Sequence, residues 1–173
     1  KSVLEYANHL SKHHIETITH LFKEERIAIP DGFTKDEVNP NAPRLFSDGF
    51  YLMYVLNQAK FGITAYGLAL TNSARADIRK FYSELNASSI ELFNQSSDVL
   101  LDKGLFLRAP SIPYPNKVEY IEKQSFLTGW LGDRRPLNGI EISQLYFNLL
   151  RNLIGSAFTL GLAQVARSPS VRD

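Results

Sequence analysis

The chain has 173 residues, of which 44% are hydrophobic, and its 19 basic and 18 acidic residues leave a net charge of +1. That length predicts a single domain, residues 1–173, with enough apolar surface to fold without cross-links. The near-neutral charge argues against nucleic-acid binding, and the lack of cysteine excludes disulfides and thiolate metal sites, which agrees with a cytoplasmic protein.

Two long helices are predicted in the first part of the chain. The first covers about residues 2–26, where apolar residues recur at three- and four-residue spacing, and Pro30 stops it. The second covers about residues 45–71. Pro43 suits the first turn of this helix, and Ser47 supplies a capping hydroxyl near its start. The connection between the two helices, which ends in "NAPRLFSDGF", is therefore predicted to be structured.

Two more long helices are predicted in the second part. The third covers about residues 74–103, with Asn72 or the serine after it as the N-cap. The fourth covers about residues 138–166. Asn138 and Glu141 begin it with the spacing of a cap and its reciprocal partner. Between these helices the chain is proline-rich and extended, with a short helical piece predicted near its end.

These four helices predict an all-α fold, an up-down-up-down four-helix bundle with long structured connections between its first and second and its third and fourth helices. The joint near residue 72 is too short for a crossover, so the second and third helices must be antiparallel neighbours. Two glycines in "FGITAYGLAL", residues 61–70, allow close helix packing there. The short helical piece spans about 118–130, and residues 167–173 are predicted to be a frayed tail.

The second and fourth helices are apolar around more of their circumference than a bundle can cover, since a bundle buries only about a third to a half of each helix. On the fourth helix most of the circle is apolar: Leu145, Phe147, Leu149, Leu150, Leu153, Ile154 and Phe158. We expect the aromatic segment 105–130 and a second copy of the chain to cover the remainder. The sequence therefore predicts a homodimer through the second and fourth helices.

The same two helices raise the question of membrane insertion. Residues 46–70 and 140–166 are rich in apolar side chains, but Lys60, Glu141 and Arg151 interrupt them. A charge near the centre of a spanning helix costs roughly 2.5 to 3.5 kcal/mol. We therefore expect no transmembrane segment.

All four histidines lie on the first helix. His9, His13, Glu16 and His20 share a narrow arc almost opposite the apolar stripe, with spacings of four, three and four residues. Such an arc can hold a divalent metal between neighbouring turns, and it can equally be a solvated polar face.

His14 differs because it falls inside the apolar stripe. A buried imidazole needs a hydrogen-bonding partner, and Asn57 on the inner face of the second helix could supply one across the bundle. This interior polar pair fixes helix register in one interpretation. In the others it forms a metal or proton site, or the polar contacts of a small-molecule site between helices.

The pattern of a catalytic centre is missing. Di-iron bundles need Glu-x-x-His on two helices, and this sequence has no such motif; Glu5 to His9 and Glu16 to His20 are one residue too long. No nucleophile, base and orienting group can be assembled from spacing. We expect no catalytic residues and no enzymatic activity.

A resemblance to a known family rests on four stretches: "IPDGFTKDEVNPNAPRLFSDGFYLMY", "SARADIRKFY", "KQSFLTGWLGDRRPLNGIEI" and "GLAQVARSPSVR". Together they resemble an uncharacterised family from spore-forming Gram-positive bacteria, some of whose members are labelled spore-coat proteins and whose fold is described as ferritin-like. Some relatives look like tandem duplications of the unit. The resemblance implies a ferritin-like bundle and offers no established catalytic residues to carry over to this chain.

The first expectation for function is thus a non-enzymatic structural or interaction protein of the spore coat or of sporulation, cytoplasmic or spore-associated. Its partners would be a second copy or other coat-type proteins. The alternatives are a metal-binding bundle that uses the histidines of the first helix and a bundle that binds a small molecule.

Overall fold

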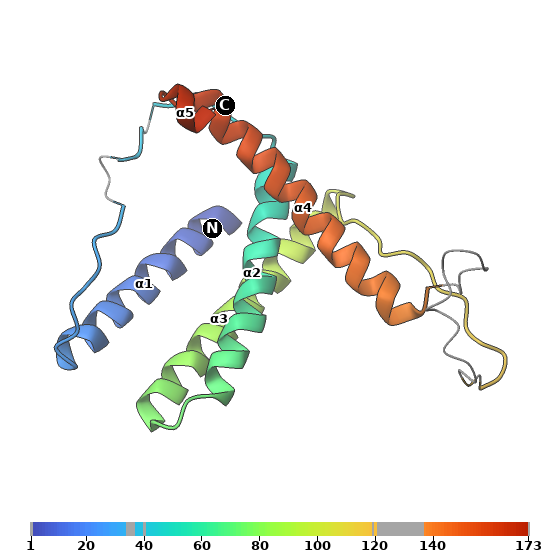
Figure 1. Ribbon diagram of the computed structural model, residues 1–173, viewed down its shortest axis with the longest axis horizontal. Coiled ribbons are helices and arrows are strands. Elements are labelled where there is room, and N and C mark those ends of the chain that lie inside the picture. Colours follow the sequence, from blue (N-terminus) through green and yellow to red (C-terminus); the bar gives the residue numbers. More distant parts are fainter. Residues whose placement is uncertain (1, 34–36, 40, 119, 121–136, 173) are drawn as a thin grey trace. The chain divides into compact units, whose positions relative to one another are not determined.

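The structure is a computed structural model that describes residues 2–33, 37–39, 41–118, 120 and 137–172 (Figure 1). The described residues form helices and no β-strand, which confirms the all-α prediction. They divide into two compact units, Lys1–Phe106 together with Leu160–Asp173, and Leu107–Thr159. This division does not test the prediction of a single domain.

Helix α1 (Val3–Glu24) begins at a capping box. The N–H of Glu5 donates to the Ser2 hydroxyl oxygen over 3.2 Å, and the N–H of Ser2 donates to the Glu5 carboxylate over 3.0 Å. These two bonds satisfy donors that a helix start leaves without a partner. Two residues after the last helical residue, Arg26 adopts a φ of 56°, so α1 ends slightly earlier than predicted.

Helix α2 (Asp48–Thr71) begins three residues later than predicted. Ser47 is its N-cap and has an extended backbone with ψ of 160°, so the helix cannot reach back to Pro43, which lies outside it. Arg44 holds the segment that directly precedes the helix. Its Nε donates to the Phe46 carbonyl over 2.7 Å, and its guanidinium pairs with the carboxylate of the first helical residue. Local bonds therefore hold the last residues of the connection, from Arg44 onward, against the start of α2.

Helix α3 (Ala76–Asp102) has Arg75 as its N-cap, without a side-chain capping bond. The prediction that Asn72 or Ser73 caps it is wrong, because both side chains instead donate to carbonyls of the last turn of α2. Arg75 ties two helix ends together through an ion pair of 2.6 Å with Glu25, which follows α1. The end of α1 is thereby held at the start of α3.

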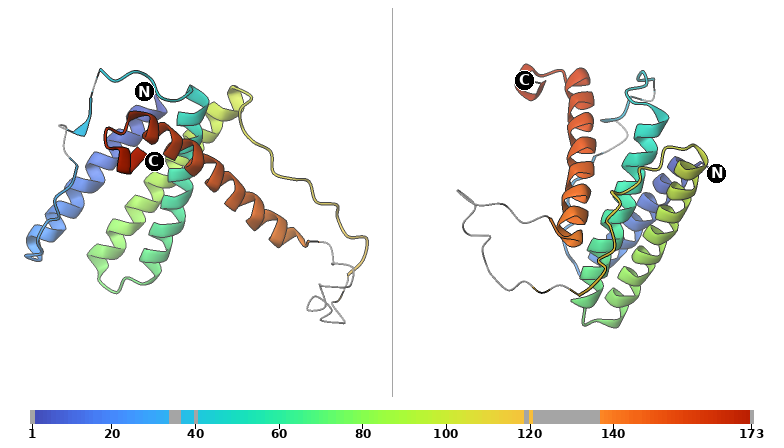
Figure 2. Two further views of the ribbon diagram at one scale, coloured as in Figure 1. Left: turned by 45° about the horizontal axis from the view of Figure 1, so that its top comes forward. Right: turned by 90° about the vertical axis from the view of Figure 1, so that its right-hand side faces the viewer.

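Helices α2 and α3 run antiparallel and side by side, joined by a short turn (Figures 1 and 2). This confirms the prediction for the second and third helices. A Cβ added to Gly62 would lie 2.5 Å from the Ser89 hydroxyl oxygen, so the glycine permits close packing, as the sequence predicted. α1 packs on α3 and on α2. The core joins all three helices: Val3, Leu52, Val55, Leu56, Ala59, Leu92 and Leu100.

Helix α4 (Gly139–Val165) begins in the second unit with the predicted reciprocal cap. The Glu141 N–H donates to Asn138 Oδ1 and the Asn138 N–H donates to Glu141 Oε2, both over 2.9 Å. The Tyr146 hydroxyl donates to the Arg108 carbonyl over 3.2 Å and holds the extended proline-rich segment on the helix. The helical piece predicted at about 118–130 falls largely outside the described residues.

The last turn of α4 belongs to the first unit and meets the segment that precedes α2. A side chain at Gly161 would collide with the ring of Phe46, which itself stacks on Phe50 with ring centroids 4.2 Å apart. The predicted frayed tail contains a short helix, α5 (Pro169–Arg172). No helix in the described part of the chain is long and apolar enough to cross a membrane.

Candidate functional site

The histidine arc lies on the exposed face of α1. His9, His13, Glu16 and His20 are all exposed, and His20 Nδ1 lies 3.5 Å from a carboxylate oxygen of Glu24 one turn further on. Among the described residues no group of three or more His, Cys, Asp or Glu side chains is placed to hold a metal ion. The whole arc lies among the described residues, so its side chains are not assembled around a common point, and a metal on this arc stays a prediction.

His14 is half-buried between helices, and its hydrogen-bonding partner lies on α3. Its Nε2 lies 3.2 Å from the Ser88 hydroxyl oxygen, whereas the Asn57 side-chain amide donates to the Met53 carbonyl of its own helix over 2.9 Å. The two side chains predicted to pair therefore have separate partners. The physical reason is that α1 packs more extensively on α3 than on α2, so a hydrogen-bonding group of α3 lies within reach of the imidazole.

The hydrogen bonds around His14 define which of its ring nitrogens donates and which accepts. Ser88 donates its hydroxyl proton to the Leu85 carbonyl over 2.9 Å, so its oxygen accepts from His14 Nε2–H. Burial, and then the charge of His13, lower the pKa of His14. The imidazole is therefore neutral near pH 7 with an acceptor lone pair on Nδ1.

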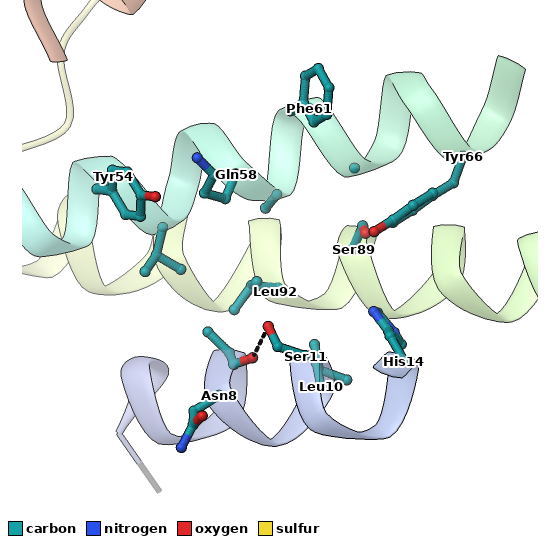
Figure 3. Close-up of a pocket in the computed structure, with 14 residues that line it drawn as sticks. Asn8, Leu10, Ser11, His14, Tyr54, Gln58, Phe61, Tyr66, Ser89 and Leu92 are labelled. Atoms are coloured by element: carbon teal, nitrogen blue, oxygen red, sulfur yellow. Dashed lines mark hydrogen bonds between the residues drawn. The ribbon is translucent and has the colours of Figure 1, made fainter. Parts of the chain in front are cut away.

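Beside His14 lies a cavity of about 450 Å³ between α1, α2 and α3 (Figure 3). Small-molecule sites typically measure about 300 to 1,000 Å³. Apolar residues form much of its wall: Ala7, Leu10, Val55, Ala59, Phe61, Gly62 and Leu92. Polar side chains complete it: Asn8, Ser11, His14, Tyr54, Gln58, Tyr66 and Ser89. No lysine, arginine, aspartate or glutamate is among the lining residues.

Tyr66 is a cavity residue that reasoning from the sequence missed. It extends from α2 toward Ser89 and the region of His14, with its ring edge-on to the imidazole at a centroid distance of 6.2 Å (Figure 3). Side chains of helices lean toward the N-terminal turn, and Gly62 one turn earlier leaves room there, since its Cβ position is 3.3 Å from the Tyr66 ring. A glycine one turn before an aromatic residue is the signal that could have identified it.

A second polar contact joins α1 to α3 near this cavity. Burial, and then a hydrogen bond to the Glu91 carboxylate and the charge of that group, raise the pKa of Tyr6 to about 12. The Tyr6 hydroxyl thus keeps its proton and donates it to Glu91 throughout the physiological range. This bond and the His14–Ser88 bond hold α1 on α3 at two points along its length.

The comparisons with known proteins concern the same helices. A family model described as "Protein of unknown function (DUF3231)" matches residues 1–118, which include α1, α2, α3 and the whole lining of the cavity. No curated protein and no solved structure matches the chain.

Proposed function

Because the chain belongs to the DUF3231 family of proteins of unknown function, we propose its role from its own surfaces: it is a non-enzymatic structural or interaction protein that pairs with a second copy of itself. The spore coat, or another structure formed in sporulation, is the proposed setting, with other coat-type proteins as further partners. That setting is supported by the resemblance of the four sequence stretches.

The observation that carries this proposal is the exposure of apolar side chains on two opposite sides of α4. At about 100° per residue, two stripes can be traced along the helix. Stripe A contains Ile140, Phe147, Leu162 and Val165, and stripe B contains Leu145, Leu149, Leu153 and Leu160. All eight are exposed; Leu145, Leu149 and Leu153 are 56 to 57% exposed and Ile140 is 76% exposed. Exposed apolar surface on both sides of one helix favours association.

Two stripes on one helix can serve two contacts. We propose that one stripe closes an up-down-up-down, ferritin-like four-helix bundle with α1, α2 and α3, and that the other meets a second copy. α2 adds to the interface, since Phe61 is 60% and Leu68 is 65% exposed. The arc of stripe B contains no charged residue, so a twofold-symmetric contact through it would bring no like charges together, whereas Arg151 lies on the arc of stripe A beside Phe147.

Sedimentation equilibrium combined with elemental analysis, on protein purified without a histidine tag, tests this role. We expect the mass of two chains at micromolar concentration, because surfaces of this kind associate at about that level or more tightly. We also expect metal well below one equivalent per chain. A chain that sediments as a monomer throughout would contradict the proposed dimer.

The same protein, purified without a histidine tag, also tests the metal-binding alternative. It requires about one equivalent of bound metal that is lost in a His9→Ala plus His13→Ala variant or in His14→Ala. Sub-stoichiometric metal that these changes leave unaltered would remove that alternative and would leave the proposed dimer intact.

A further inference from the structure

We propose that the cavity between α1, α2 and α3 is a binding site for an uncharged amphiphile, a small molecule with an apolar body and a hydrogen-bonding group at its end. The site lies wholly within the first compact unit. One lining residue, Phe61, is also assigned to the proposed dimer contact, so the variants below leave it unchanged and the two proposals can fail separately.

The preference for an uncharged molecule follows from the lining. Ala59 and Leu92 are almost completely buried core residues at the cavity wall, so a ligand there replaces water with apolar contacts. None of the lining side chains carries a formal charge near pH 7, because His14 is neutral. A formal charge on the ligand would lose its hydration without gaining an opposite charge.

Hydrogen-bonding groups are available at both ends of the cavity. His14 Nδ1 is an acceptor at one end, where the Tyr66 hydroxyl also points (Figure 3). Asn8 and Gln58 supply amide groups near the other end (Figure 3). A hydroxyl on the ligand would donate to Nδ1 while its oxygen accepts from Tyr66, whereas the N–H of an uncharged amide or aromatic amine would donate to Nδ1 or to the Tyr66 hydroxyl oxygen.

The probe for this site is N-phenyl-1-naphthylamine, an uncharged fluorescent molecule with an apolar body and one N–H. Its matched charged control is 8-anilinonaphthalene-1-sulfonate, which adds a sulfonate to the same framework. We expect saturable binding of the uncharged probe to the full chain at one site per chain, and binding of the sulfonate weaker by about tenfold or more.

Two variants assign the binding to the cavity. Ser11→Trp places a large ring in the cavity from an exposed position on α1, whereas Lys12→Trp places the same ring on the adjacent exposed residue, which does not line it. We expect Ser11→Trp to weaken the uncharged probe about tenfold or more, and Lys12→Trp to leave it unchanged. Circular dichroism checks that both variants remain helical.

A second pair tests the polar end. Tyr66→Phe removes only the hydroxyl, and Tyr82→Phe does the same to a neighbouring tyrosine that does not line the cavity. We expect Tyr66→Phe to weaken the uncharged probe about three- to tenfold, because the Tyr66 hydroxyl oxygen no longer accepts from the N–H of the probe, and Tyr82→Phe to have no effect.

The pH dependence follows from His14. Its pKa is lowered, so the neutral acceptor form persists through neutral pH, and binding weakens only as the pH falls through that lowered pKa and Nδ1 becomes protonated. The titratable groups that face the ring are His13 on α1 and Tyr66 on α2. His14→Ala should abolish this dependence, while His9→Ala should keep it.

Three results would overturn the proposal. The first is no saturable binding of the uncharged probe, and the second is equal binding of the sulfonate. The third is binding that Ser11→Trp leaves unchanged but that charged substitutions on α4 remove, because the probe would then report the exposed apolar surface.

Discussion

Leu100→Ala is expected to lower the free energy of unfolding by about 3 kcal/mol, within the range of about 2 to 5 kcal/mol for leucine-to-alanine changes in cores. Leu100 is 0% exposed and belongs to the cluster that joins α1, α2 and α3. The loss combines the transfer of the missing methyl and methylene groups with the cavity they leave. Chemical denaturation followed by circular dichroism measures it.

The neighbouring residue supplies the control. Leu101 is 60% exposed, so Leu101→Ala should change the free energy of unfolding by less than about 0.5 kcal/mol. Equal effects of the two substitutions would show that the core is not built around the face of α3 that carries Leu100.

Charged substitutions on the two stripes of α4 are expected to have different effects. Leu149→Glu with Leu153→Glu changes stripe B, and Ile140→Glu with Phe147→Glu changes stripe A. The pair on the stripe that meets the second copy should raise the dissociation constant of the dimer by about 100-fold or more while helix content stays unchanged. The reason is that buried apolar side chains are lost from the contact in each of two copies. The pair on the stripe that closes the four-helix bundle should lower the midpoint of thermal unfolding, because it places charges in the contact between α4 and the other helices.

Asn148→Glu with Asn152→Glu is the matched control, since it adds the same charges to the polar side of α4, where both amides only bond back to their own helix. This control should sediment and melt like the unaltered chain. If both stripe variants remain dimers with unchanged stability, α4 contributes to neither contact and the assignment of its stripes is wrong.

Local chemistry made part of the fold predictable. The bonds between Asn138 and Glu141 depend on residues three apart, so their spacing alone predicted the start of α4. The start of α2 was predicted less well. Pro43 is compatible with a first helical turn, but the extended backbone of Ser47 decides where the helix begins, and composition does not reveal that angle.

The candidate site depended on tertiary information that spacing does not contain. His14 was predicted to face the interior because it interrupts an apolar stripe, and it is half-buried in the structure, while a functional role for it stays a prediction. Its partner was not predicted correctly, since either α2 or α3 could face it, and the relative packing of three helices selects Ser88. Tyr66 was missed because its role depends on the space left beside Gly62, a property of two helices in contact.

An isotope-filtered NMR measurement on a mixture of copies tests the central claim, that apolar surface on α2 and α4 is covered by a second copy. One copy carries ¹³C-labelled leucine methyl groups and the other carries none, at a concentration where sedimentation indicates pairing. The account predicts nuclear Overhauser contacts from the labelled leucine methyls of stripe B, or from those of Leu162 on stripe A, to aromatic protons of the unlabelled copy, including those of Phe61. A spectrum without contacts between copies, or with contacts confined to leucines of α1 and α3, would contradict it.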